Sequence, residues 1–204
     1  MTTTPFYVNN ARFRTEYFEP RRRLFERLAR EGQHPQLLYI GCADSRVTPE
    51  FVTAAEPGQV FVARNIGNLV PSPYSASVSV GAFVEYGIHH LHIPHIAVCG
   101  HTGCGGVKAI AGGVAAMPAG SPLRTWLTHA GWVPDAPGDL SPATLTRLVK
   151  RNVLQQIEHL KMYPVVSEAL TARRVTLHAW IYEIETGGLT EYSEAEGDFV
   201  PLGE

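Results

Sequence analysis

The chain has 204 residues, a length that fits a single domain with a sizeable buried core. Hydrophobic residues make up 45% of it and charged residues 18%, which is typical of a folded globular protein and argues against disorder. The formal net charge of −2 argues against nucleic acid as the partner.

The first ten residues, MTTTPFYVNN, contain neither a basic segment nor the apolar run of a secretory leader. No stretch approaches the roughly 18 apolar residues of a membrane-spanning helix. We therefore expect a cytoplasmic protein that does not enter a membrane.

The first half of the chain is predicted to be a helical arm followed by alternating strands and helices. Residues 7–31 carry apolar side chains at helical spacing, with an interruption near Pro20. Short apolar runs predict three strands, at 36–41, 59–64 and 95–99. Two helices are expected between these strands, a short one beginning near Pro49 and a longer one over 77–89.

The second half continues the alternation. The predicted elements are a helix opening at 107–111, a loop with one short helix over 112–141, a long helix from Ser141-Pro142 to about Met162, and a strand over 173–182. Strands that alternate with helices predict an α/β fold, a mainly parallel β-sheet flanked by helices, with an N-terminal helical arm. We expect one domain over 1–204, with the arm at 1–31 and the core at 36–204.

Two cysteines and a histidine follow predicted strands. Cys42 comes after the first strand, and His101 and Cys104 come after the third. Because open α/β sheets build their sites at the carboxyl ends of strands, these side chains are predicted to meet there. Two thiolates and one imidazole favour tetrahedral zinc, and three protein ligands leave one position for water, which is typical of a catalytic site. We therefore expect a zinc-binding core with Cys42, His101 and Cys104 as ligands.

A carboxylate and a guanidinium lie beside the first ligand. Asp44 could occupy the fourth zinc position, which would give an inactive site, or it could be drawn aside by Arg46, whose planar fork matches a carboxylate. The second arrangement leaves the water position open. Asp44 and Arg46 are therefore the candidate catalytic pair.

Five sequence blocks occur in the order found in one enzyme family. They are CADSR (42–46), PGQVFVARNIGN (57–68), VEYGI (84–88), CGHTGCGG (99–106) and LHAWIYEIETGGL (177–189). With them the chain resembles the β-class carbonic anhydrases from about residue 6 to its C-terminus. It is most similar to the plant-like subtype with an accessible site and, among bacterial members, to those of the cyanate-operon type. The bicarbonate-inhibited subtype, by contrast, carries a tryptophan where this chain has Tyr39, although Arg64 and Tyr182 match its other regulatory positions.

The resemblance implies an activity and an assembly. The expected reaction is the reversible hydration of carbon dioxide to bicarbonate and a proton by a zinc-bound hydroxide, with one zinc per chain. The family's site lies at a subunit boundary, so a homodimer or a higher homo-oligomer is expected. Two thiolates cancel the charge of the zinc ion, so the activity is expected to be favoured by alkaline pH.

The resemblance also implies a substrate pocket. Gln33 matches a glutamine that donates a hydrogen bond to a substrate oxygen, and Phe61 and Tyr86 match an aromatic wall. Val47 and Gly105 are expected to complete an apolar pocket. Without the resemblance, the apolar residues around Phe61 and Tyr86 in the sequence would predict that both side chains lie in the core.

Three other activities use the same residues. One is hydrolysis of a carbon dioxide analogue such as carbon disulfide on the same zinc site. Another is a zinc-thiolate redox sensor without catalysis, with Cys99 as resolving thiol, although Cys99 reads as a buried apolar side chain and a sensor needs no partner for Asp44. The third is a hydrolase with a cysteine nucleophile, which needs a free thiol beside a base.

Overall fold

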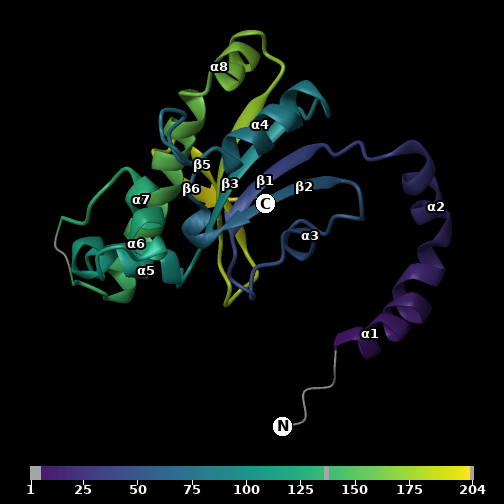
Figure 1. Ribbon diagram of the computed structural model, residues 1–204, viewed down its shortest axis with the longest axis horizontal. Coiled ribbons are helices and arrows are strands. Elements are labelled where there is room, and N and C mark those ends of the chain that lie inside the picture. The colour runs from purple at the N-terminus through teal and green to yellow at the C-terminus, as the bar shows by residue number, and fades with distance from the viewer. Residues whose placement is uncertain (1–5, 136–137, 203–204) are drawn as a thin grey trace. The chain divides into compact units, whose positions relative to one another are not determined.

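The computed structural model describes residues 6–135 and 138–202, and the chain divides after His34 into an N-terminal unit and a core unit (Figure 1). The N-terminal unit consists of four consecutive helical segments: α1 (Phe6–Phe13), a π-helical turn η1 (Arg14–Phe18), a 3₁₀ turn η2 (Glu19–Arg21) and α2 (Arg22–Glu31). The predicted interruption near Pro20 is present as the 3₁₀ turn.

The N-terminal unit exposes apolar surface. Rings on its helical segments contact one another, with Phe18 and Phe25 stacked at 4.8 Å between ring centres and Phe13 stacked on Tyr17 at 5.6 Å. No residue of η1, η2 or α2 is buried. This unit therefore does not build a core of its own.

The core unit contains a six-stranded mixed sheet in the order β2-β1-β3-β4-β5-β6. The strands are β1 (Leu37–Cys42), β2 (Val60–Asn65), β3 (His95–His101), β4 (Thr176–Tyr182), β5 (Leu189–Ser193) and β6 (Asp198–Pro201). The first four in this list are parallel to one another, and β5 and β6 add an antiparallel edge. The predicted α/β fold with a mainly parallel sheet is confirmed.

The helices between the strands begin at residues that favour helix starts. They are α3 (Pro49–Val52), α4 (Ser79–His89), α5 (Gly105–Ala111), α6 (Pro122–Leu127), α7 (Pro142–Lys161) and α8 (Pro164–Thr171), with 3₁₀ turns η3 (Ile66–Asn68), η4 (Val114–Ala116) and η5 (Thr128–Ala130). Four of these helices have proline in the first turn, where the missing N–H is not needed. None of the described helices combines the length and apolar character that a membrane crossing requires.

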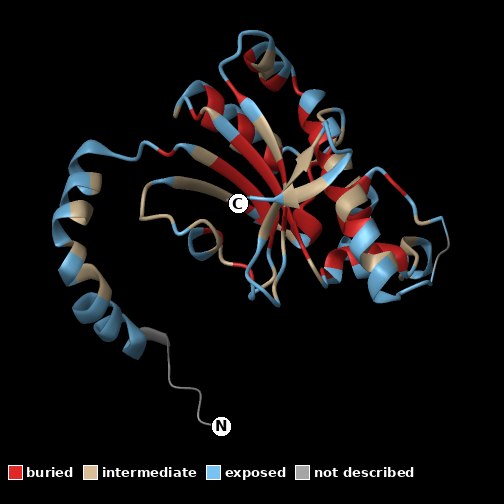
Figure 2. Cartoon of the chain, turned by 180° about the vertical axis from the view of Figure 1, so that it is seen from behind, coloured by how far each residue is buried: buried red, intermediate tan, exposed pale blue. Residues whose placement is uncertain are grey.

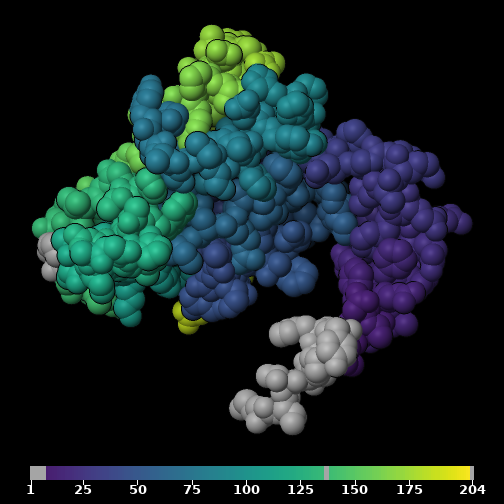
Figure 3. All heavy atoms as spheres, viewed as in Figure 1, coloured from purple at the N-terminus to yellow at the C-terminus, as the bar shows by residue number. Residues whose placement is uncertain are grey.

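Glycines bring α4 and α7 close to one face of the sheet. A side chain added at Gly87 of α4 would meet Leu38 of β1 at 2.6 Å, and one added at Gly100 of β3 would meet Val153 of α7 at 2.7 Å. The central strands are buried along most of their length (Figure 2), and α4 and α8 pack together beside them (Figures 1 and 3). The fold therefore holds the carboxyl ends of β1 and β3 on a rigid, close-packed base.

The structure corrects the sequence predictions at the C-terminal end. The strand predicted over 173–182 begins at Thr176, because Arg173 has a left-handed backbone (φ 54°) and closes the turn that ends α8. The helix α8 and the strands β5 and β6 were not predicted. Their signals are present in the sequence as Pro164 at a helix start and Gly187-Gly188 before an alternating run.

Candidate metal centre

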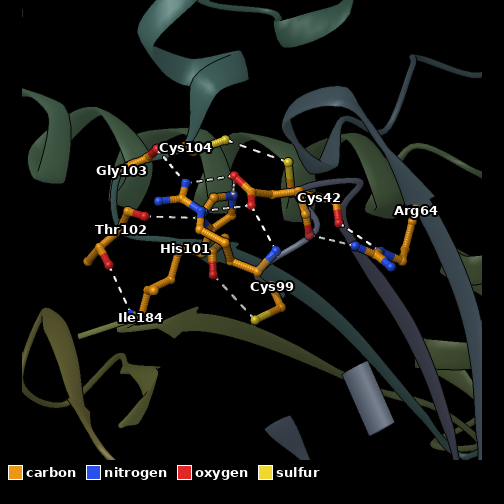
Figure 4. Close-up of polar contacts among 11 residues, drawn as sticks. Cys42, Arg64, Cys99, His101, Thr102, Gly103, Cys104 and Ile184 are labelled. Atoms are coloured by element: carbon orange, nitrogen blue, oxygen red, sulfur yellow. Dashed lines mark hydrogen bonds and ion pairs between the residues drawn. The ribbon is translucent and has the colours of Figure 1, made fainter. Parts of the chain in front are cut away.

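Three sulfur and nitrogen donors meet at the carboxyl edge of the sheet. Cys42 ends β1, His101 ends the neighbouring parallel strand β3, and Cys104 immediately precedes α5. Gly103 adopts a left-handed backbone (φ 67°), which turns the chain from β3 into α5. The predicted ligands Cys42, His101 and Cys104 are thus brought together, with ligand atoms within 4.8 Å of one another (Figure 4).

The distances and the burial fit a tetrahedral zinc ion. The two sulfurs lie 3.8 Å apart, far beyond a disulfide bond, whereas zinc–sulfur bonds of about 2.3 Å at the tetrahedral angle separate two sulfurs by about 3.8 Å. His101 is fully buried, its Nδ1 donates to the Thr102 carbonyl at 3.0 Å, and its Nε2 has no hydrogen-bond partner. A buried nitrogen without a partner, beside two sulfurs, is the donor set of a metal site.

Hydrogen bonds favour thiolate character at the site. The Cys104 thiol donates to Cys42, and with further N–H donors from Gly67 and Asp44 this lowers the pKa of Cys42 below that of an ordinary thiol. The same proton, together with burial, raises the pKa of Cys104. The backbone N–H groups of Val107 and Gly106 at the start of α5 act against this rise in the pKa of Cys104, so a metal ion that replaced the shared proton would be bound by two thiolates.

Asp44 and Arg46 form the predicted forked pair at the rim of the site. Arg46 donates from Nε to Oδ1 at 2.9 Å and from an Nη to Oδ2 at 2.7 Å, and its backbone N–H also donates to Oδ1. The guanidinium holds the pKa of the Asp44 carboxyl well below its usual range. Oδ2 lies 3.8 Å from His101 Nε2, so the carboxylate borders the donor set while both its oxygens are engaged by Arg46.

Arg64 fixes the backbone of the segment that carries these groups. Its Nε donates to the Cys42 carbonyl at 2.9 Å and an Nη donates to the Asp44 carbonyl at 2.6 Å (Figure 4). The side chain therefore connects β2 to the chain leaving β1. The sequence indicates Arg64 only as a match to a regulatory position of the bicarbonate-inhibited subtype, whereas its contacts to this segment appear only in the structure.

The predicted pocket residues have different surroundings. Phe61 of β2 lies 5.9 Å from Tyr86 of α4 between ring centres, and Tyr86 is 47% exposed, which contradicts its interpretation as a core residue. Val47 is buried and donates its N–H to the Asp44 carbonyl, while Gly105 is exposed and faces open space. Gln33 is exposed and belongs to the N-terminal unit, so its place in the pocket remains a prediction.

A hollow of about 590 Å³ includes Ala43, the residue after Cys42, in its lining, and most of its lining is apolar. Its lining comes from the segment after Cys42, from β2, from α4 and from α6, and includes Ala43, Val62, Ile66, Phe83 and Trp126. Trp126 Nε1 donates to the Ile66 carbonyl at 2.8 Å, which fixes the indole against the end of β2. Ile66 and Trp126 lie far apart in sequence, and only the contact of α6 with η3 brings both of them to this hollow.

Cys99 does not join the donor set. It is 1% exposed, its Sγ donates to the Gly100 carbonyl at 3.4 Å, and burial raises its pKa to about 12. The prediction of a buried, apolar side chain is confirmed.

Known proteins share this fold and these sequence blocks. The carbonic anhydrase family matches residues 37–189. A carbonic anhydrase from Pseudomonas aeruginosa is 40% identical over 197 residues, which cover 95% of this chain and 89% of that protein. The solved structure of the β-carbonic anhydrase CcaA superposes with a TM-score of 0.89 at 36% identity, covering 96% of this chain and 97% of that one.

A tetrameric β-carbonic anhydrase of Sordaria macrospora superposes with a TM-score of 0.75 at 30% identity, over 92% of this chain and 94% of that one. The sequence relatives and the solved structures agree over almost the whole length of the chain. The chain therefore belongs to the β-class carbonic anhydrase family of enzymes.

Proposed function

We propose that this enzyme catalyses the reversible hydration of carbon dioxide to bicarbonate and a proton, with one zinc ion held by Cys42, His101 and Cys104. The observation that supports this best is the buried His101 Nε2 without a partner beside two sulfurs 3.8 Å apart. A zinc ion bound there supplies a Lewis acid that makes water nucleophilic, less strongly than at a tris-histidine site because two thiolates neutralise its charge.

Asp44 and Arg46 are proposed to orient the reacting water. Arg46 keeps the Asp44 carboxylate ionised and engages both of its oxygens, so Asp44 remains an acceptor at the rim. An ionised Asp44 can accept a hydrogen bond from the attacking water and direct its lone pair toward the substrate carbon. Release of Asp44 from Arg46 would let it take the fourth zinc position and close the site.

The substrate pocket is proposed to combine Val47, Gly105, Phe61 and Tyr86 with Gln33. The mostly apolar side chains in this set suit an uncharged, nonpolar gas. Gln33 would donate a hydrogen bond to a substrate oxygen, an interaction that strengthens as charge moves onto that oxygen.

The active unit is proposed to be a homodimer or a larger homo-oligomer. The N-terminal unit has stacked aromatic rings but no buried residue in η1, η2 or α2, so its apolar side chains lack a core. Phe61 and Tyr86 form a second apolar surface on the core unit, of which Tyr86 is half exposed. A related enzyme of Sordaria macrospora is tetrameric, which supports assembly in this family.

The test combines metal analysis with gas hydration. The purified full chain is expected to contain one zinc per chain and to hydrate carbon dioxide in stopped-flow assays, faster as pH rises from neutral to alkaline. Cys42→Ser and Cys104→Ser should each lose zinc and most activity. Full zinc content and normal turnover in either variant would refute the ligand assignment, and hydrolysis of carbon disulfide without hydration of carbon dioxide would replace the proposed substrate.

A further inference from the structure

The turn that joins β3 to α5 carries two of the three proposed ligands, His101 and Cys104. Between them Gly103 has a left-handed backbone (φ 67°), and a side chain added there would meet nothing within 4 Å, so packing does not fix this residue. Arg46 donates to the Gly103 carbonyl only at 3.4 Å, from the exposed rim of the site. The position of the turn therefore depends mainly on the hydrogen bonds of the remaining residue, Thr102.

Thr102 is held at two points by the chain that leaves β4. Its N–H donates to the Tyr182 carbonyl at 3.0 Å, and its Oγ1 accepts the Ile184 N–H at 3.1 Å (Figure 4). The parallel pairing of β3 with β4 ends at His101 and Tyr182. The Thr102 hydroxyl therefore extends the contact between the two chains beyond the last strand pair, at the residue that follows a proposed ligand.

The turn that connects β4 to β5 gives this hydroxyl a fixed donor. The Glu183 N–H donates to the Gly188 carbonyl and the Gly187 N–H donates to the Glu183 carbonyl, each at 2.8 Å. Thr186 adds two side-chain bonds, since its Oγ1 donates to the Glu183 carboxylate at 2.7 Å and accepts the Gly188 N–H at 3.1 Å. These hydrogen bonds close the turn around Ile184, so the Ile184 N–H has a defined position.

The Thr102 carbonyl is the partner of the His101 ring, whose Nδ1 lies 3.0 Å from it. A carbonyl only accepts hydrogen bonds, so Nδ1 carries the ring proton and Nε2 keeps its lone pair for a metal ion. His101 is fully buried, and its Nε2 has no hydrogen-bond partner, so neither water nor a second bond orients the ring. The direction of the Nε2 lone pair therefore depends on where the Thr102 peptide is held.

We infer that Thr102 is a positioning residue for the metal centre: the bond from Ile184 to its hydroxyl fixes the Thr102 peptide, and the Thr102 carbonyl fixes the His101 ring. This inference rests on the zinc site proposed above. Partners that orient a ligating histidine set its tautomer and direction, and their loss weakens metal binding although every ligand remains. Without the hydroxyl, Thr102 is held on this side only through its own N–H, so the ring can turn its Nε2 away from the two sulfurs.

The test is Thr102→Val in the full-length enzyme, because valine keeps the branched shape of threonine and lacks its hydroxyl. Loss of a group that orients a ligand typically weakens metal binding by ~10- to 100-fold, so zinc competition with a chromogenic chelator should show a dissociation constant higher by that factor. In the cobalt-substituted protein the visible d–d bands should change, since they report the arrangement of the ligands around the metal. Thr102→Ala removes the same hydroxyl and provides the same readouts if the valine variant does not fold.

Two matched controls separate this role from a general loss of stability. Thr102→Ser keeps the hydroxyl and should restore the zinc affinity and the cobalt spectrum. Thr190→Val removes a hydroxyl from the neighbouring strand β5, where Oγ1 donates to the Ile181 carbonyl at 3.4 Å, and should leave both readouts unchanged.

Two results would overturn the inference. One is a Thr102→Val protein with the zinc affinity and the cobalt spectrum of the wild type. The other is a Thr102→Ser protein that loses as much zinc affinity as Thr102→Val, since the hydroxyl would then not be the group that acts. A wild type that gives no thiolate-to-cobalt band would instead overturn the zinc site on which the inference rests.

Discussion

Gly106→Ala should destabilise the enzyme and weaken its hold on zinc through a single added methyl group. The new Cβ would lie 2.8 Å from the Gly67 Cα and 2.9 Å from the Gly67 nitrogen, well inside ordinary van der Waals contact. Both neighbours are backbone atoms, so α5 must move away from η3. Overpacking of this kind costs about 1 to 3 kcal/mol, which exceeds the gain of up to about 1 kcal/mol from replacing glycine by alanine in a helix.

With the full helix gain subtracted, the net loss is up to about 2 kcal/mol, so the melting temperature of the zinc-loaded variant should fall by up to about 8 °C, since 1 kcal/mol corresponds to about 2 to 4 °C in a chain of this size. Zinc should also dissociate faster in the presence of a chelator, because α5 carries Cys104 at its start. Gly112→Ala, at the other end of α5, is the matched control, since its Cβ meets nothing closer than 3.6 Å. A Gly106→Ala protein that melts with the control and keeps full zinc would refute the close backbone approach.

Three further predictions concern the rim, the N-terminal unit and the third thiol. Arg46→Ala should keep zinc but lower the rate of carbon dioxide hydration by roughly the hundred- to thousandfold typical of losing a positioned electrostatic partner. Arg46→Lys should restore this rate poorly, because an ammonium group cannot contact both oxygens of Asp44 in the same way. Near-normal rates in Arg46→Ala would exclude this role. Deletion of residues 1–19 should weaken assembly and activity together, measured by sedimentation and stopped flow, whereas a fully active monomer would contradict the shared site. Cys99 is 1% exposed, so a thiol reagent should leave it unmodified in the native zinc protein. The same reagent should label all three cysteines once the protein is denatured in the presence of a chelator. Rapid labelling of Cys99 in the native protein would support the sensor hypothesis.

The sequence predicted the parallel part of the sheet because its strands are continuous apolar runs. Strands predicted at 36–41 and 59–64 correspond to β1 and β2 within one residue. The antiparallel edge was missed, since β5 and β6 are short and none of their residues is fully buried. Continuous apolar runs therefore identify the strands that form the core, but they do not identify strands that are only partly buried.

The ligand set could be predicted for a different reason. Cys42 and His101 end neighbouring parallel strands, so position along the chain alone places them at one edge. Asp44 and Arg46 are two residues apart, and their fork is a local contact. Gly67 and Asn152 are separated by 85 residues, and no local pattern connects them, so only the packing of α7 on the sheet reveals their contact.

The environment of the two sulfurs is set first by the hydrogen bond between them and by burial, and then by backbone N–H groups. Backbone N–H groups of Val107 and Gly106 favour a lower pKa for Cys104, and those of Gly67 and Asp44 favour a lower pKa for Cys42. Gly67 and Gly106 pack without side chains between them, so η3 and the start of α5 approach each other closely. The Gly67 peptide is fixed by Asn152 from the opposite side. A substitution that adds bulk at Gly106 therefore acts on the start of the helix that Cys104 precedes, without changing any of the proposed ligands.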